Sequence, residues 1–241
     1  VRGRVPSQDL FRDRYGFVNL TSSLGYVRQI SENSTFRTNI GTAWRTPNMA
    51  ELFSFGQHGF KTSFGLLRYY TNEDGRLRTD RVIPMKDSEI SPEKGYKWIN
   101  EWKTKKNKHT YTFTFYTNYI ENFIFDRPLA VIGTVRGPMT VFIYDQANAL
   151  FIGTDFSWQN KWSRSLNGTF GTSYLWSRNL KKNEALINQP SVTTSYKLNW
   201  EAKNFWKLSS SQIFIKPSYT FRQIQAPRTI RPEDLIDGTA I

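Results

Sequence analysis

The feature that most constrains this chain is a series of segments in which polar and apolar residues alternate with a period of two. From Thr35 to Trp44, for example, Phe36 and Ile40 share one parity while Arg37 and Asn39 share the other. Such alternation predicts β-strands with one apolar and one polar face. It predicts about eight strands, over Phe17–Gln29, Thr35–Trp44, Glu93–Lys103, His109–Phe123, Gly153–Lys161, Leu166–Trp176, Ser191–Glu201 and Ser210–Arg222.

The connections between these segments alternate in length. Short connections such as "SENS" and "TKKNK" take turns with long ones, which cover Arg45 to about Ile90 and Ser177 to Pro190. Tight turns on one side and long loops on the other are typical of outer-membrane β-barrels. The pattern therefore predicts an all-β, antiparallel transmembrane barrel.

Aromatic residues support the same interpretation. They make up 16% of the chain although its mean hydropathy is −0.57. A barrel shows such rings to lipid in two bands, and the apolar parity places Trp44 and Trp176 near long loops and Trp102, Trp162 and Trp200 near short turns. The alternative is a soluble antiparallel sandwich, whose connections would not need to alternate in length.

The composition argues against an enzyme. The chain has no cysteine and two histidines, His58 and His109, and its glycines do not form a phosphate-binding loop. We therefore expect no catalytic constellation and no cofactor. A net charge of +13 favours an anionic partner. The basic run "KTKKNK" fits a solvated turn better than a nucleic-acid patch, so no nucleic-acid partner is expected.

Several motifs carry a family resemblance. "GTAWRTPNMAELFSFGQHG" (41–59) resembles the segment of TonB-dependent outer-membrane transporters in which a barrel strand ends in an aromatic residue, Arg, a small residue and Pro, followed by Glu-Leu. "SPEKGYKWINEWK", "YTFTFYTNYIENFIF", "VFIYDQANALFIGTDFSW" and "NQPSVTTSYKLNW" resemble later strands of the same family, in the same order. The match is to the C-terminal half of the barrel and is Bacteroidetes-like.

The resemblance implies a part of a barrel of roughly 22 strands. Residues 1–241 are then expected to be a partial barrel domain without the plug, the first part of the barrel and the closing strands. The implied function is import of a scarce ligand, a ferric siderophore or another metal complex, across the outer membrane of a Gram-negative bacterium. A TonB-type complex would supply the energy, and outer-membrane lipids and lipopolysaccharide would surround the barrel.

Two other functions stay open at this stage. One is a surface glycan-binding protein that transports nothing, and the other is a porin without a plug. A plug domain in the full protein would decide for transport, whereas conductance without a coupling partner would identify a porin.

Candidate site residues follow from their positions. Pro47 removes a ladder donor and ends a strand, so Arg45 is expected to point inward and anchor the loop base, with Glu51 as its partner. The candidates for ligand contact are Phe53, Phe55, His58, Tyr69 and Tyr70 in the long loop, and those for the lumen are Arg37, Asn39, Glu101 and Asp155. His58 matches a loop histidine in a subgroup that includes zinc importers, so it is the candidate metal ligand.

The alternation also assigns faces. The residues expected toward lipid are Val18, Leu20, Phe36, Trp98, Phe113, Phe156, Tyr196 and Ile215. Those expected toward the interior are Asn19, Asn39, Thr114, Ser157, Ser195 and Ser218.

Overall fold

The computed structural model describes residues 16–59, 61–68, 70–71, 77–78, 82–134, 137–205 and 208–225. Its elements are β1 (Ser23–Ser31), β2 (Ser34–Arg45), α1 (Met49–Phe53), β3 (Phe55–His58), β4 (Lys61–Phe64), β5 (Tyr70–Thr71), β6 (Leu77–Arg78), η1 (Met85–Asp87), β7 (Glu93–Lys106), β8 (His109–Thr134), β9 (Gly137–Lys161), β10 (Leu166–Asn179), β11 (Thr193–Phe205), β12 (Leu208–Ile215) and β13 (Ser218–Thr220).

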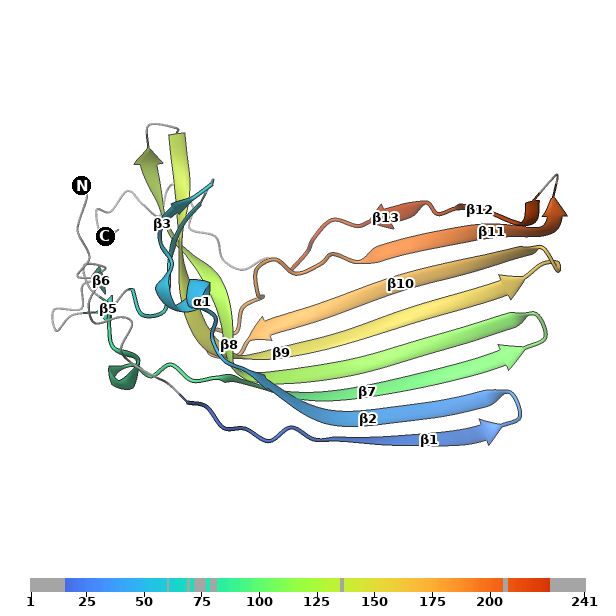
Figure 1. The fold of residues 1–241 in the computed structure, drawn as a ribbon, viewed down its shortest axis with the longest axis horizontal. Coiled ribbons are helices and arrows are strands. Elements are labelled where there is room, and N and C mark those ends of the chain that lie inside the picture. The colour runs from blue at the N-terminus through green and yellow to red at the C-terminus, as the bar shows by residue number, and fades with distance from the viewer. Residues whose placement is uncertain are drawn as a thin grey trace.

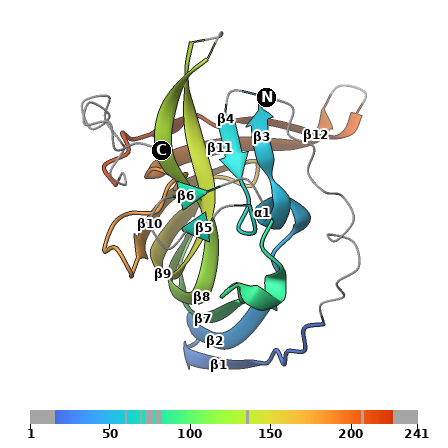
Figure 2. The same cartoon turned by 90° about the vertical axis from the view of Figure 1, so that its left-hand side faces the viewer.

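The strands form an antiparallel meander. Eight of them follow the order β1-β2-β7-β8-β9-β10-β11-β12 within an 11-stranded sheet, which confirms the predicted all-β class and the number of main strands. Figure 1 shows their short turns gathered at one end and the long connections, with α1 and β3, at the other. Figure 2 shows the strands following an arc, and within the described residues this sheet is not closed.

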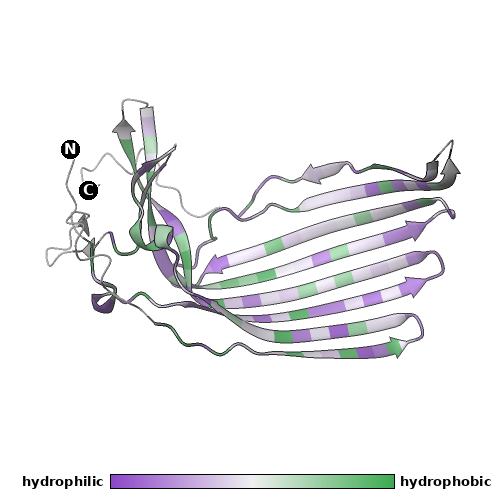
Figure 3. Cartoon of the chain, viewed as in Figure 1, coloured by the Kyte–Doolittle hydropathy of each residue, from purple (hydrophilic) through white to green (hydrophobic). Residues whose placement is uncertain are grey.

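Hydrophilic and hydrophobic residues alternate along the strands (Figure 3), and the ladder register places residues of each kind opposite one another. Pairing runs Phe36 to Trp102, Trp102 to Phe113, and Phe113 to Phe156, so these rings form a row on what we call the apolar face. One residue along, a second row lies on what we call the polar face: Arg37, Glu101, Thr114, Asp155 and Ser173. Opposed residues share a face because side chains alternate along each strand.

The apolar face is unusually exposed. Leu24, Ile40, Trp98 and Phe113 are 43–77% exposed, although each lies within a regular strand. Rings pair across strands, for example Tyr96 with Tyr119 at 6.1 Å between centroids. Since water disfavours so large a contiguous apolar surface, this face requires a cover outside the described residues.

The boundaries of β1, β12 and β13 differ from the sequence predictions. β1 begins at Ser23, so Val18, Asn19 and Leu20 lie before it and have no face in the sheet. The predicted strand from Ser210 to Arg222 is two strands interrupted before Ser218, since Pro217 cannot donate to the ladder.

The largest correction concerns β8 and β9. They contain 26 and 25 residues, whereas the alternation predicted a strand end at Phe123 and a strand start at Gly153. The extra length lies beyond a register shift between Ile120 and Phe123, where Asn122 has a φ of 55°. A bulge adds a residue and bends the pair, which breaks the alternation that identifies a strand.

Among the described residues, no helix is long and apolar enough to cross a membrane.

Candidate functional site

The long connection after β2 folds into a small cap. Leu52, Leu67 and Met85 form its buried core, with Phe53 packed against them. The backbone N–H groups of Leu66 and Leu67 donate to the carbonyls of Glu51 and Leu52 at 2.7 and 3.0 Å. Gly65 permits this approach, because a Cβ there would lie 2.4 Å from the backbone of Leu52. The described part of the predicted loop is therefore a folded structure at the long-connection end of the sheet.

A cluster of polar side chains anchors this cap to the sheet, and we call Arg45, Asn48, Glu51 and Glu93 the loop-base cluster. Arg45 donates to both oxygens of Glu51 at 2.8 and 2.9 Å and to both oxygens of Glu93 at 2.7 and 2.9 Å. The structure thus brings together Arg45 and its expected partner Glu51. The second carboxylate, Glu93, comes from the start of β7, and sequence reasoning missed it because 48 residues separate it from Arg45.

The two carboxylates hold further backbone groups. Glu51 accepts from the Asn48 N–H at 2.8 Å while Asn48 Oδ1 accepts from the Glu51 N–H, so the pair caps α1. Glu93 also accepts from the Ile124 N–H at 2.6 Å. Because Glu51 and Glu93 are 8% and 7% exposed, their charges depend on Arg45 for compensation.

The Gln146 side chain makes three hydrogen bonds at the start of the β8–β9 extension. Its amide donates to the carbonyls of Ser91 at 2.7 Å and Asn122 at 2.9 Å, and its oxygen accepts from the Ser91 N–H at 3.2 Å. This residue is part of the "VFIYDQANALFIGTDFSW" motif. Its contacts connect β9 with the entry to β7 and the bulge of β8.

Next to this base lies a four-stranded projection, which we call the outer ribbon. It consists of β3, β4, the part of β8 after Ile120 and the part of β9 before Asn148. β4 pairs in parallel with β9, with Thr62 opposite Val141, and β3 pairs with β4. Figure 1 shows the β8–β9 pair turning away from the line of the other strands beside β3.

Cations and aromatic rings gather on the outer ribbon. Lys61 Nζ lies 2.8 Å from Asp126 and 5.4 Å from the ring centroid of Phe142. The Asp126 carboxylate raises the pKa of Lys61, so Lys61 is charged at neutral pH. Arg127 pairs with Asp145 at 2.9 Å.

A second cationic position lies beside β3. The Arg68 guanidinium is 5.0 Å from the ring centroid of Phe55, and burial lowers the pKa of Arg68. Phe55 and Phe64 meet edge to face at 5.6 Å. Phe55 remains 48% exposed. Cations held against rings in this way suit an anionic ligand that has an aromatic or flat group.

The other predicted loop residues fall in different places. Phe53 packs against the cap core. His58 is the last residue of β3, with its backbone opposite Lys61, and Tyr70 is the first of β5; their side chains lie outside what the structure describes. Tyr69 lies outside the described residues altogether. Within the described part of the chain, no three His, Cys, Asp or Glu side chains form a metal-binding group.

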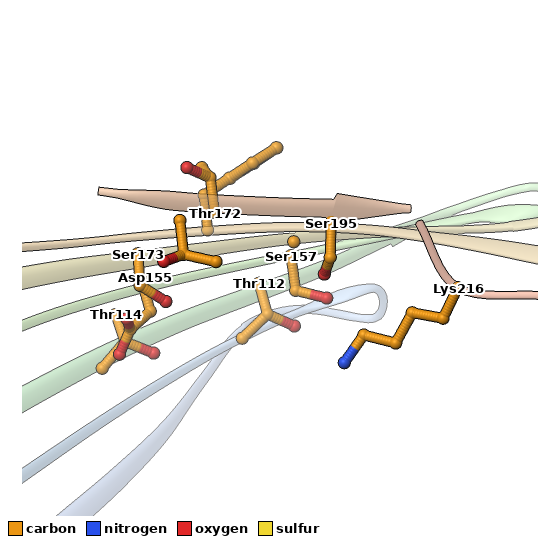
Figure 4. A pocket seen from close by; sticks show the side chains of 11 residues that line it. Thr112, Thr114, Asp155, Ser157, Thr172, Ser173, Ser195 and Lys216 are labelled. Carbon is orange, nitrogen blue, oxygen red and sulfur yellow. The ribbon is translucent and has the colours of Figure 1, made fainter. Parts of the chain in front are cut away.

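Below the outer ribbon, the polar face carries two hollows. One, of about 390 Å³, is lined by Thr112, Asp155, Ser157, Ser195 and Lys216 among others, and Figure 4 shows these side chains along one side of the strands. The second, of about 370 Å³, is lined by Asn39, Lys97, Asn118, Arg45 and Glu93 among others. Arg37 and Glu101 form an ion pair at 2.6 Å on the same face. The predicted lumen residues Arg37, Asn39, Glu101 and Asp155 thus share one face.

Comparison with known proteins identifies relatives of the fold. No protein family and no curated protein matches the sequence. Among solved structures, the copper transporter OprC superposes with a TM-score of 0.52 at 14% identity, over 80% of this chain and 30% of that one. A mutant of the ferric enterobactin receptor PfeA from Pseudomonas aeruginosa gives 0.51 at 17% identity, over 77% and 26%. The chain therefore has the sheet architecture of part of these proteins and spans less than a third of their length.

Proposed function

We propose that this chain forms part of the barrel of an outer-membrane importer that takes up a ferric siderophore or another metal complex in a Gram-negative bacterium. A TonB-type complex would supply the energy. The assignment to the TonB-dependent family, to the C-terminal half of its barrel and to a Bacteroidetes-like form rests on the sequence motifs. On this proposal residues 1–241 are a partial barrel domain, and lipids and lipopolysaccharide surround it.

The observation that carries this proposal is the two-faced sheet. Most exposed rings and aliphatic side chains lie on one face and most hydroxyl, amide and charged groups on the other, across eight antiparallel strands whose register is regular between the short turns and the β8 bulge. Lipid would cover the apolar face, and the polar face would line an interior. A soluble sandwich would instead bury its apolar face.

The outer ribbon supports the choice of ligand. Lys61 lies against Phe142 and Arg68 against Phe55 at the end where the long connections lie. Lys61 is paired with Asp126, whereas Arg68 takes part in none of the ion pairs of the described residues. An anionic metal chelate, which brings its own metal ligands, would find an unpaired charge at Arg68 and flat surfaces at the neighbouring rings. Binding of a bare ion such as zinc would need several protein ligands, of which His58 is the candidate.

The test is binding and uptake by the full-length protein. Trp fluorescence would measure the affinity for a ferric catecholate, a ferric hydroxamate and Zn²⁺, using the native protein, Arg68→Gln, and Arg164→Gln as a control from the short-turn end. We expect one ferric chelate to bind, and Arg68→Gln to weaken it about tenfold, as loss of a charged contact would. Arg164→Gln should leave it unchanged.

Four results would contradict parts of the proposal. Equal binding by native protein and Arg68→Gln would remove the Arg68–Phe55 position from the site. Uptake that persists without TonB would exclude energised import. Zinc affinity unchanged in His58→Ala would exclude His58 as a metal ligand, and tight zinc binding without any chelate binding would replace the siderophore by the bare ion.

A further inference from the structure

The short-turn end of the sheet carries a group of cations that the proposed transport does not use. They come from two neighbouring hairpins, β7–β8 and β9–β10, and all six residues are exposed. We call them the turn-end cations: Lys103, Lys105, Lys106, Lys108, Lys161 and Arg164. By the register, Lys106 is on the side of the apolar face and Lys103, Lys105 and Lys161 are on the side of the polar face, while Lys108 and Arg164 lie in the turns. The β7–β8 turn is tight, with Asn107 at a φ of 52°, so its lysines are held close together.

Among the described residues, these cations have no carboxylate partner. None of the ion pairs in the described part of the chain involves a turn-end cation. The Lys108 ammonium donates to the Trp162 carbonyl at 3.5 Å. At the long-connection end, Arg45, Lys61 and Arg127 each pair with a carboxylate, while Lys86, Lys181 and Lys182 take part in none of the ion pairs of the described residues.

The acidic residues near the short turns do not balance this charge. Glu32 lies in the β1–β2 turn. Glu201 on β11 accepts a hydrogen bond from Asn199 at 2.6 Å. Neither pairs with a turn-end cation in the described part of the chain, so the cations keep their charge for an external partner.

A band of aromatic rings lies just inside the turn-end cations. Trp102, Tyr111 and Trp158 are on the apolar face, with Tyr111 opposite Trp158 and their rings stacked at 6.5 Å. Trp102 is 49% exposed and lies four residues before the end of β7, about 13 Å along the strand. Trp and Tyr rings prefer the boundary between hydrocarbon and headgroups, and long cationic side chains reach from there to the headgroups.

From this order of rings and cations we propose that the short-turn end binds the headgroups of anionic phospholipids. The inference rests on the membrane placement in the proposed function. A cluster of several Lys or Arg directly beside a membrane-embedded segment recognises anionic lipid. Lysine suits a phosphate diester because it is a compact charge that needs no fixed approach geometry.

The experiment uses the full-length protein with lipids in non-ionic detergent. Native mass spectrometry would give the dissociation constants of phosphatidylglycerol, phosphatidylcholine with the same acyl chains, and lipopolysaccharide. The test variant is Lys105→Gln/Lys106→Gln/Lys108→Gln. The matched control, Lys86→Gln/Lys181→Gln/Lys182→Gln, removes the same charge from exposed lysines at the long-connection end.

We expect the native protein and the control to prefer phosphatidylglycerol, and the test variant to lose about tenfold or more of that preference. Resistance to unfolding in SDS would show that each variant is folded. Equal loss in both variants would attribute the effect to net charge and overturn the proposal. The proposal would also be overturned if the native protein did not prefer phosphatidylglycerol to phosphatidylcholine. It would be overturned as well if the test variant lost lipopolysaccharide binding and kept its preference for phosphatidylglycerol.

Failure of the proposed function would look different. A protein that is not a membrane barrel would retain no phospholipid of either kind, whereas failure of the headgroup proposal alone would leave both lipids bound with equal affinity.

Discussion

At the scale of single residues, Arg45 has the largest structural role at the mouth of the sheet. Its guanidinium binds two carboxylates, and each carboxylate also accepts a backbone N–H, from Asn48 and from Ile124. One side chain thus joins the end of β2, α1, the start of β7 and β8. Lysine could not replace it, because an ammonium lacks the planar fork that binds two carboxylates at once.

Replacing Arg45 by lysine is expected to loosen α1 and the segment around Leu66 and Leu67 while the sheet stays folded. The local free energy of opening should fall by about 2 kcal/mol, less than for a fully buried pair, since the Arg45 side chain is 43% exposed. Hydrogen exchange of the full-length protein would show faster exchange at Leu66 and Leu67, whose amides bond to α1.

Arg37→Lys is the control for this change. Its ion pair with Glu101 is more exposed, with side chains 51% and 32% accessible, so it should alter stability by less than about 1 kcal/mol. Faster exchange of the cap in Arg37→Lys, or unchanged exchange in Arg45→Lys, would show that the loop-base cluster does not hold the cap.

At the scale of elements, the unexpected feature is the parallel pairing of β4 with β9. β4 belongs to the connection after β2, and its partner residues lie about 80 positions later, at Thr140–Ile143. Thr62 and Ser63 are 9% and 2% exposed, and because neighbouring side chains of a strand point to opposite faces, β4 is covered on both faces at these residues.

A pair of cysteines would test this register, since the chain has no cysteine of its own. Thr62→Cys with Val141→Cys should form a disulfide on mild oxidation, because register partners in a sheet lie within bridging distance and point to the same side. Peptide mapping under non-reducing conditions would detect the link. Thr62→Cys with Phe142→Cys places the thiols on opposite sides, so cross-linking of this second pair with equal yield would contradict the register.

The same elements show what could be predicted from the sequence. Regular alternation over Thr35–Trp44 and Glu93–Lys103 located β2 and β7 to within a few residues, because one face meets a different environment from the other. The outer halves of β8 and β9 were not predicted, because a bulge and the pairing with β4 replace the regular alternation there. In the site, Glu51 was found because it is close in sequence to Arg45, whereas Glu93 and the Lys61–Asp126 pair depend on tertiary contacts.

At the scale of the whole molecule, one property organises the chain. On the short-turn side of the β8 bulge, the register of the eight strands keeps the rows of rings and the rows of polar groups apart. Slipping any strand by one residue would exchange its faces and break both rows. The two faces therefore depend on every hairpin at once, so the proposed placement in a membrane would depend on this register.

Neighbouring residues offer an internal comparison for this placement. Single cysteines at Phe113, Thr114, Phe156 and Ser157 would be tested in the full-length protein in lipid vesicles with a small, charged thiol reagent. Thr114→Cys and Ser157→Cys lie on the polar face and should react, while Phe113→Cys and Phe156→Cys should be protected by lipid. Equal reaction at Phe113→Cys and Thr114→Cys would refute lipid cover of the apolar face.

β8 is longer than a membrane-spanning strand needs to be, so on the proposed placement part of the β8–β9 hairpin extends beyond the membrane. A tilted strand crosses a bilayer with about 9–11 residues, while β8 has 26. At about 3.3 Å per residue, the excess amounts to roughly 50 Å of hydrogen-bonded hairpin. The outer ribbon, which carries Lys61, Arg127 and their carboxylate partners, would then stand well clear of the lipid surface. A particle too large to pass between the long connections would touch this hairpin first.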